Sequence, residues 1–215
     1  MKTIKPDVNS EEYRNAISVE RMRLSDKYTI ENLIESKELM HRAALGIYDS
    51  VEWSDKRAAI VCGSGNNGGD GYALAGIIAE NGGSAVIFRI GERFSDDGRY
   101  YYEKACELGV EDRLFDEDTS FDGFDIIVDC ILGTGFRGKP EGLVAAAINR
   151  INDSGAYKVC ADINSGMNGD TGEALLAVKS DITVSIGYYK KGMFLKDAPR
   201  LISNLVNIDI GIVLI

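Results

Sequence analysis

The hydrophobic pattern divides the chain into a helical N-terminal stretch and a longer region in which strands and helices alternate. Up to about residue 55, apolar residues recur at helical spacing, as at Met40, Ala43, Ala44 and Ile47, and a shorter helix is predicted over 18–28. Farther along, short continuous apolar runs predict strands over 57–62, 84–90, 125–130, 157–162, 180–186 and 205–208. The periodic segments between them predict helices over 72–81, 96–108 and 143–151.

This alternation is typical of βαβ units, which produce a mostly parallel sheet with helices on both faces. We therefore predict an α/β protein of Rossmann-like type, a three-layer α/β/α sandwich with additional N-terminal helices. A chain of 215 residues suits one domain, and the sequence shows no internal repeat, low-complexity segment or linker. Residues 1–215 are accordingly predicted to form a single domain.

Composition and charge exclude several classes of protein. Hydrophobic residues make up 45% and charged residues 27%, which is too apolar for a disordered chain, and the net charge is -10. An acidic protein gains no general attraction to nucleic acid, so an anionic ligand has to be bound locally by backbone N–H groups. The four cysteines lack CxxC spacing and are expected to be reduced core residues. We expect a soluble cytoplasmic protein with no secretion signal, no membrane span and no nucleic-acid partner.

Candidate chemistry follows three of the predicted strands. One strand runs into the segment Gly-Ser-Gly-Asn-Asn-Gly-Gly-Asp-Gly at residues 63–71, another has Asp129 next to its last residue, and a third ends at Asp162. In an open parallel sheet, ligands bind outside the carboxyl ends of the strands. The three segments are therefore predicted to converge on one ligand-binding crevice.

The glycine-rich segment has the composition of a phosphate-binding turn. Its glycines allow successive N–H groups to point inward, and the following helix adds its positive N-terminal end. Gly63, Gly65 and Gly68 fit the spacing of a dinucleotide-binding turn, although no acidic residue closes the second strand to bind a ribose, and a tight turn that binds nothing shows the same spacing. The two adjacent asparagines and Asp70 favour a ligand. Lys190, after a later strand, either reaches a phosphate or lies in a solvated loop, which is the simpler interpretation.

Oxygen-bearing side chains indicate a cation site rather than a catalytic triad. Asp129 and Asp162 each end an apolar strand, where either carboxylate could simply cap backbone N–H groups. Together with Asn67 and Ser165 they offer only hard oxygen ligands, which suit a large monovalent or an alkaline-earth cation and not zinc. The only histidine, His41, lies in the N-terminal helical stretch without a nucleophile elbow elsewhere, so a Ser-His-Asp hydrolase is not expected.

Four motifs occur in a characteristic order along the chain. They are Leu39-Met40-x-Arg42-Ala43-Ala44, the glycine-rich segment 63–71, Val128-Asp129-x-x-x-Gly133-Thr134-Gly135 and Asp162-Ile163-x-Ser165-Gly166, followed by Lys191. In this order they resemble the NAD(P)H-hydrate epimerase family, also called the YjeF N-terminal domain. The resemblance extends over about residues 17–211, and the Asn-Asn-Gly-Gly-Asp-Gly core is its most specific part.

The resemblance implies an isomerase that interconverts the R and S forms of hydrated NADH or NADPH, of which a dehydratase repairs only one. It implies that Asp162 is the acid–base residue and that each subunit holds one potassium ion (K+), bound by Asn67, Asp129 and Ser165. It also implies a homodimer that acts with a separate or fused dehydratase. The implied substrate contacts are Asn66, Asn67, Gly68, Gly69, Asp70, Gly133, Thr134, Gly135, Phe136, Arg137, Gly138, Lys139 and Asp162.

Two positions depart from the family pattern. Asn164 stands where the family usually has proline, which predicts a looser turn beside Asp162, and His41 stands where it usually has Glu or Asn. Two other functions are open: a non-catalytic nucleotide-binding or dimerisation scaffold of the same fold, and a domain that regulates an attached enzyme. The retained binding motifs and the acidic composition favour the epimerase. The preference for the NADH or the NADPH hydrate does not follow from the sequence.

Overall fold

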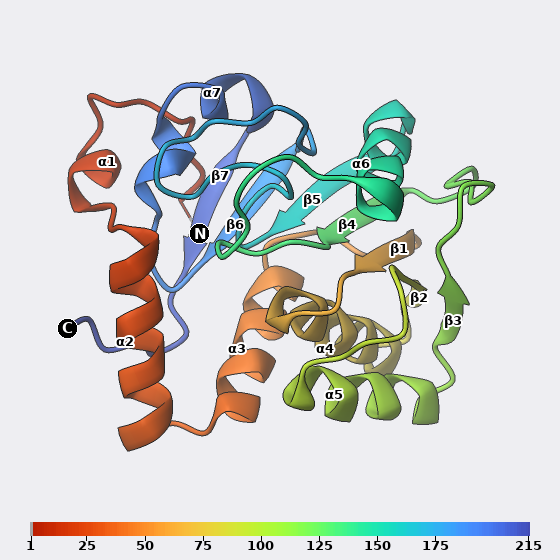
Figure 1. Ribbon diagram of the computed structural model, residues 1–215. Helices are drawn as coiled ribbons and strands as arrows, with labels where there is room; N and C mark the ends of the chain where they lie inside the picture. Colours follow the sequence, from red (N-terminus) through yellow and green to blue (C-terminus); the bar gives the residue numbers. More distant parts are fainter. Residues whose placement is uncertain (1) are drawn as a thin grey trace.

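One parallel sheet organises the chain (Figure 1). The computed structural model describes residues 2–215. Its strands are β1 (Arg57–Cys62), β2 (Ser84–Arg89), β3 (Glu111–Leu114), β4 (Ile126–Cys130), β5 (Tyr157–Ala161), β6 (Ile182–Ile186) and β7 (Leu205–Ile208). They lie in the order β3-β2-β1-β4-β5-β6-β7, and every neighbouring pair is parallel. The mostly parallel sheet predicted from the sequence is thereby confirmed.

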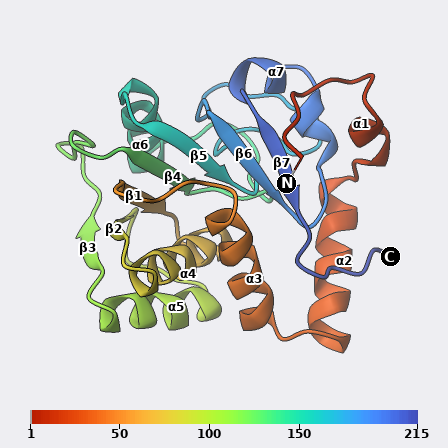
Figure 2. The same cartoon turned by 180° about the vertical axis from the view of Figure 1, so that it is seen from behind.

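Helices cover both faces of this sheet. They are α1 (Glu11–Asn15), α2 (Val19–Asn32), α3 (Ser36–Tyr48), α4 (Asn66–Glu80), α5 (Asp96–Glu107), α6 (Gly142–Asp153) and α7 (Ala198–Leu201), with a 3-10 turn η1 (Lys191–Phe194). α3, α4 and α5 lie on one face and α6 and α7 on the other, so the three-layer arrangement is confirmed (Figures 1 and 2). Within residues 2–215, no helix is long and apolar enough to cross a membrane.

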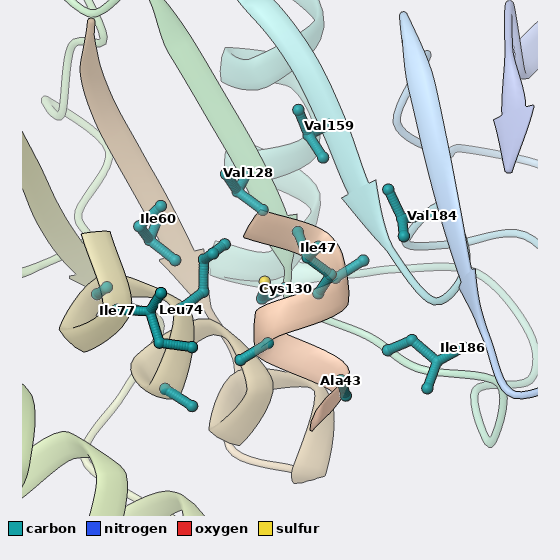
Figure 3. Close-up of a cluster of buried hydrophobic side chains, with 14 of the residues drawn as sticks. Ala43, Ile47, Ile60, Leu74, Ile77, Val128, Cys130, Val159, Val184 and Ile186 are labelled. Carbon is teal, nitrogen blue, oxygen red and sulfur yellow. The ribbon is translucent and has the colours of Figure 1, made fainter. Parts of the chain in front are cut away.

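Alternate strand residues fill the cores on the two sides of the sheet. Ile60 of β1 and Val128 of β4 face α3 and α4, where they join a cluster with Ile47 and Leu74 (Figure 3). The intervening strand residues, such as Ile127, belong to a second cluster under α6. Strands covered on both faces need apolar residues at nearly every position. This is why β1 and β4 stand out in the sequence as continuous apolar runs.

Three elements differ from the sequence prediction. α4 begins at Asn66 rather than at residue 72, because the glycine-rich segment itself forms the first turns of the helix. β3 was not predicted, because it is a polar edge strand with little buried surface and therefore has no apolar run. The short α1 buries no residue, and it is capped by Ser10, whose side chain accepts a hydrogen bond from the Tyr13 N–H.

The strand order reverses between β1 and β4. After β1 the chain passes to α4 on one face, and after β4 it passes to α6 on the other face (Figure 1). Connections that depart to opposite faces leave a crevice between them at the carboxyl end of the sheet. Because all strands run parallel, the segments after β5 and β6 reach this end as well.

Candidate functional site

A pocket of about 540 Å³ lies at the carboxyl ends of β1, β4, β5 and β6. This volume is within the range of small-molecule sites. Part of its wall is made by the segments that follow the strands, through residues such as Asn66, Gly133 and Asp162. α2 and α3 supply another part, through residues such as Asp26 and Met40. The pocket thus brings together the three segments that the sequence predicted to converge.

The predicted glycine turn is the start of a buried helix. A Cβ atom on Gly63 would lie 2.0 Å from the Ile131 carbonyl oxygen, and one on Gly68 would lie 2.0 Å from the Gly63 carbonyl oxygen. Both positions exclude side chains because β1, α4 and the segment after β4 pack backbone to backbone. This packing leaves the N-terminal end of α4 facing the pocket, and residues 64–67 form part of the pocket lining. The N–H groups that a helix leaves unpaired at this end are suited to binding a phosphate.

Gly68 and Gly69, which were predicted to contact the substrate, are buried behind the pocket lining. A Cβ atom on Gly69 would lie 2.5 Å from Met40 Cε and 3.2 Å from Gly98 Cα. The Gly69 N–H donates a hydrogen bond to the Gly65 carbonyl oxygen within the helix, at 3.2 Å. The structure therefore gives these two glycines a role in packing α4 against its neighbours.

Only the first half of the predicted segment 133–139 reaches the pocket. Its lining residues are Gly133, Thr134, Gly135 and Phe136. The Arg137 guanidinium instead donates to the Thr134 carbonyl oxygen at 2.8 Å and to Asp170 at 3.1 Å. Gly138 and Lys139 also lie outside the lining. The structure thus separates the last three residues of this prediction from the rest of the site.

Asp129 is fully buried beneath the pocket and is bound to the segment that follows β5. Its Oδ1 accepts a hydrogen bond from Ser165 Oγ at 2.5 Å, and its Oδ2 accepts one from the Ser165 N–H at 2.8 Å. The Ile131 N–H and the Cys160 thiol also donate to this carboxylate. Burial raises the pKa of Asp129, although these hydrogen bonds act in the opposite direction. Asp129 thus caps backbone N–H groups, and the cation role expected for it stays a prediction.

Asn67 joins the same group through the backbone of Leu132. Asn67 Nδ2 donates to the Leu132 carbonyl oxygen at 3.2 Å, and the Leu132 N–H donates to Ser165 Oγ at 2.8 Å. The predicted cation ligands Asn67, Asp129 and Ser165 are thus gathered in one place. Asn67 Oδ1 is buried and accepts no hydrogen bond from residues 2–215. Within residues 2–215, no group of three or more His, Cys, Asp or Glu side chains could hold a metal ion. A cation at this place would therefore be bound by amide, carboxylate and hydroxyl oxygens together.

Asp162 has a strained backbone conformation. Its φ is 63°, in the left-handed region that residues with a side chain rarely adopt. Its N–H donates to the Val184 carbonyl oxygen at 2.8 Å, and its Oδ1 accepts from the Ile186 N–H at 3.2 Å. Oδ1 also forms an ion pair with Lys190, whose side chain is only 1% exposed. The prediction of a solvated loop at Lys190 is wrong.

The sequence places Lys190 after a predicted strand, although a solvated loop was the simpler interpretation of that position. Lys190 lies four residues beyond Ile186, the last residue of β6. The rule that ligands bind outside the carboxyl ends of strands applies to β6 as it does to β1, β4 and β5. Applied there, it selects this lysine as a site residue.

Two further carboxyl groups line the pocket, Asp26 from α2 and Asp70 from α4. Burial raises the pKa of Asp70 well above its ordinary value, and nearby Asp162 and Asp26 raise it further, whereas Lys190 lowers it. Burial and the proximity of Asp162 also raise the pKa of Asp26. Three carboxyl groups therefore share the field of one buried ammonium group. Asp26 and Asp70 therefore favour their protonated forms more than isolated carboxyl groups would.

Asn164 is fully buried, and hydrogen bonds hold both ends of its amide. Its Nδ2 donates to the Val178 carbonyl oxygen at 2.9 Å and to Ser180 Oγ at 3.0 Å, while its Oδ1 accepts from Thr183 Oγ1 at 2.7 Å. This network ties the turn after β5 to β6 and to the segment before it. The expectation of a looser turn beside Asp162 is therefore wrong.

The wall formed by α2 and α3 could not be recognised in the sequence. Its apolar residues, such as Met22 and Leu39, have the pattern of ordinary core positions. Asp26 carries no signal either, because α2 has several other charged residues, and most of those are exposed. His41 takes no part in the lining, and its ring stacks on that of Tyr101 with 6.5 Å between the ring centroids.

Comparisons with known proteins point to one family. Residues 36–192 match the family described as YjeF-related protein N-terminus. The chain is 32% identical to the NAD(P)H-hydrate epimerase of Limosilactobacillus fermentum, over 83% of this chain and 88% of the relative. It is 34% identical to the protein of the same name from Lentilactobacillus buchneri, over 92% of this chain and 94% of the relative. A bifunctional NAD(P)H-hydrate repair enzyme of Coxiella burnetii is 32% identical over 89% of this chain, which spans 40% of that longer protein.

A solved structure agrees with the fold. The crystal structure of a yeast protein matches with a TM-score of 0.73 at 18% identity, covering 89% of this chain and 86% of the other. The family match itself includes the glycine-rich segment, Asp129, Asp162 and Lys190, which are the residues around which the site is built. This chain therefore belongs to the YjeF-related protein N-terminus family.

Proposed function

We propose that this chain is an epimerase of hydrated NADH and NADPH, which interconverts the R and S forms at the hydroxylated ring carbon. Relatives that align with most of the chain carry the name NAD(P)H-hydrate epimerase. The observation that carries the proposal is the Asp162 carboxylate, paired with Lys190, in the same pocket as the N-terminal end of α4. One pocket therefore combines a phosphate-binding element with groups that exchange protons.

The charges of the pocket determine the orientation of the ligand. The phosphates of a dinucleotide are anionic, so they are placed at the N-terminal end of α4, where residues 64–67 lie at the positive end of the helix. Any ionised carboxyl group among Asp26, Asp70 and Asp162 would repel a phosphate. The nicotinamide end of the ligand is therefore placed beside the carboxyl groups.

The reaction breaks and re-forms one C–O bond. The ring nitrogen donates its lone pair to the hydroxylated carbon while Asp162, in its protonated form, gives its proton to the hydroxyl, which leaves as water and leaves Asp162 ionised. Water then adds to the other face of the planar iminium ring and returns its proton to Asp162. Burial raises the pKa of Asp70 and so favours a protonated carboxyl group beside Asp162. General acid–base catalysis of this kind contributes roughly 10²–10⁴-fold, and the carboxylates stabilise the positive ring as it forms.

We also propose that Asn67, Asp129 and Ser165 hold one potassium ion per subunit. The buried Asn67 Oδ1 without a hydrogen-bond donor in residues 2–215 supports this assignment, and the hard oxygen donors suit a large cation. When bound, the ion supplies a fixed positive charge beside the buried Asp129 carboxylate. Leu132 contacts both Asn67 and Ser165, so these residues fix the segment after β4 where it borders the pocket.

The proposal extends to the assembly and its location. We infer a cytoplasmic homodimer that acts with an NAD(P)H-hydrate dehydratase, either separate or fused. The bifunctional Coxiella burnetii relative, of which this chain spans 40%, supports the association of two repair activities. A dehydratase that consumes only one of the two forms depends on an epimerase to convert the other form into it.

A coupled assay tests the proposed function. A dehydratase that consumes one form of hydrated NADH leaves the other form in solution, to be converted only at the spontaneous rate. Addition of this chain should drive consumption of the remaining form to completion, at a rate that rises with the amount added. If the remaining form persists at the spontaneous rate whatever amount is added, the chain is a binding scaffold rather than an epimerase.

A further inference from the structure

Lys190 brings a buried ammonium group to the wall of the pocket. Its side chain is 1% exposed, and Nζ pairs with Asp162 Oδ1 and donates to the Ile186 carbonyl oxygen at 2.8 Å. Burying an ammonium group is costly unless it is paired and hydrogen-bonded. Both conditions are met here, because Asp162 Oδ1 and the Ile186 carbonyl oxygen accept from two of the three N–H groups of the ammonium.

The backbone fixes the position from which Lys190 reaches Asp162. The Ile17 N–H donates to the Tyr189 carbonyl oxygen at 2.9 Å, and the Lys191 N–H donates to the Ile17 carbonyl oxygen at 3.0 Å. These bonds flank Lys190 on both sides and attach it to the segment that leads into α2. The ammonium group is therefore held by a defined backbone rather than by a flexible loop.

The contacts on the Asp162 carboxylate are confined to one of its two oxygens. Oδ1 accepts from both Lys190 Nζ and the Ile186 N–H. Among residues 2–215, no donor reaches Oδ2, and the side chain is 17% exposed and lines the pocket. A carboxylate oxygen has capacity for further hydrogen bonds, so Oδ2 is available to a ligand.

We propose that Lys190 is a positioning residue for the reaction: it fixes the Asp162 carboxylate through Oδ1 and thereby presents Oδ2 to the substrate hydroxyl. This inference rests on the proposed epimerase function. Proton transfer requires donor and acceptor within hydrogen-bond reach, and a displacement of about 1 Å can lower a rate by about 100-fold. Removal of the ammonium group frees the carboxylate to turn away from the substrate, while the binding surface for the phosphates at α4 stays intact.

Three variants separate positioning from the other roles of this lysine. Lys190→Met keeps a side chain of similar length and removes the donor, and Asp162 remains partly accessible to water, so the variant is expected to fold. Lys190→Arg keeps a positively charged donor. Lys191→Met is the matched control, because it removes the same charge from the same segment. Lys191 is exposed, and the structure records no contact between it and Asp162 within residues 2–215. Thermal midpoints are recorded first, and all rates are measured well below the lowest midpoint.

Epimer exchange of hydrated NADH is followed by proton NMR to give kcat and KM, and ADP-ribose affinity is measured by calorimetry. We expect kcat of Lys190→Met to fall about 100-fold, with KM and the ADP-ribose Kd changed by no more than about twofold. Lys190→Arg should recover part of the loss, and Lys191→Met should match the wild type.

Two results would overturn this inference and leave the proposed function standing. One is a Lys190→Met variant with the kcat of the wild type, which would give the ion pair a structural role only. The other is unchanged kcat with ADP-ribose bound more than about 10-fold more weakly, a loss of over about 1.4 kcal/mol that would assign Lys190 to phosphate binding. A wild type that does not accelerate exchange contradicts the proposed function itself, and the inference with it.

Discussion

The carboxyl groups of Asp70, Asp129 and Asp162 have the same chemistry but lie in different surroundings. Both oxygens of Asp129 accept hydrogen bonds, whereas Asp162 has one oxygen fixed and one facing the pocket. Asp70 has a pKa raised by burial and by nearby carboxyl groups such as that of Asp162. The sequence indicated all three residues by their places at strand ends or in the glycine-rich segment. It could not distinguish their roles, because these depend on distant neighbours such as Ser165 and Lys190.

The Asp70→Asn substitution tests how much the buried carboxyl group of Asp70 lowers the free energy of unfolding. Burial raises the folded-state pKa of Asp70 above the unfolded value, so the folded protein binds more protons, and its stability falls as pH rises through that interval. An amide does not ionise, so the variant should be more stable than the wild type by about 0.5–2 kcal/mol near pH 7.5 and equal to it near pH 3.5. Urea unfolding at both pH values measures the difference, with Asp118→Asn, an exposed loop position, as the control. A variant that is less stable at the higher pH would contradict the assignment.

The Asn164→Ala substitution tests the buried amide network beneath the turn after β5. It removes the acceptor of the Thr183 Oγ1 hydrogen and the amide donor to the Val178 carbonyl oxygen, which should lower the free energy of unfolding by about 1–3 kcal/mol. Epimer exchange should also slow, because the same turn carries Asp162. Denaturant unfolding of Asn164→Ala, Thr183→Val and the double variant gives the coupling between the two side chains. Independent, additive losses would show that the network does not act as a unit.

At the scale of elements, the sequence predicted those that are covered on both sides. β1 and β4 are buried between helices and carry nearly continuous apolar runs, whereas the edge strand β3 carries none. The first turns of α4 were not predicted as helix because glycine is a poor helix former. Tertiary packing requires glycine at these positions nevertheless, because Gly63 lies against the Ile131 carbonyl group and Gly68 against Gly63, and neither contact leaves room for a side chain.

The junction of β4, the turn after β5 and α4 should bind potassium. Replacement of choline chloride by potassium chloride at equal ionic strength should raise the thermal midpoint, because an ion that binds only the folded state stabilises it. Asn67→Ala removes the buried Oδ1 and should abolish this increase. Asn66→Ala is the matched control, since Asn66 is the exposed neighbour in the same helical turn. An equal increase of the thermal midpoint in Asn67→Ala would remove Asn67 from the proposed cation site. No increase in the wild type would contradict the cation site itself.

At the scale of the whole molecule, the order of the strands turns separate sequence motifs into one site. Segments more than 90 residues apart, from Asn67 to Asp162, meet because parallel strands end at the same edge and the order reverses between β1 and β4. The convergence of these segments was predicted from the sequence, whereas the order of the strands was not. The wall made by α2 and α3 was not predicted either, because an apolar residue that packs in a core and one that borders a ligand have the same pattern.

The most direct test of the central claim is the rate at which hydrated NADH exchanges between its two forms, measured by proton NMR near neutral pH. We predict acceleration by the wild type and a loss of about 10²–10⁴-fold in Asp162→Asn, with ADP-ribose affinity retained. Because Asp162→Asn leaves the Lys190 ammonium group buried without its partner, the double variant Asp162→Asn/Lys190→Met serves as the folded control and should be equally slow. Exchange at the wild-type rate in either folded variant would contradict the role of Asp162, and no acceleration by the wild type would contradict the epimerase.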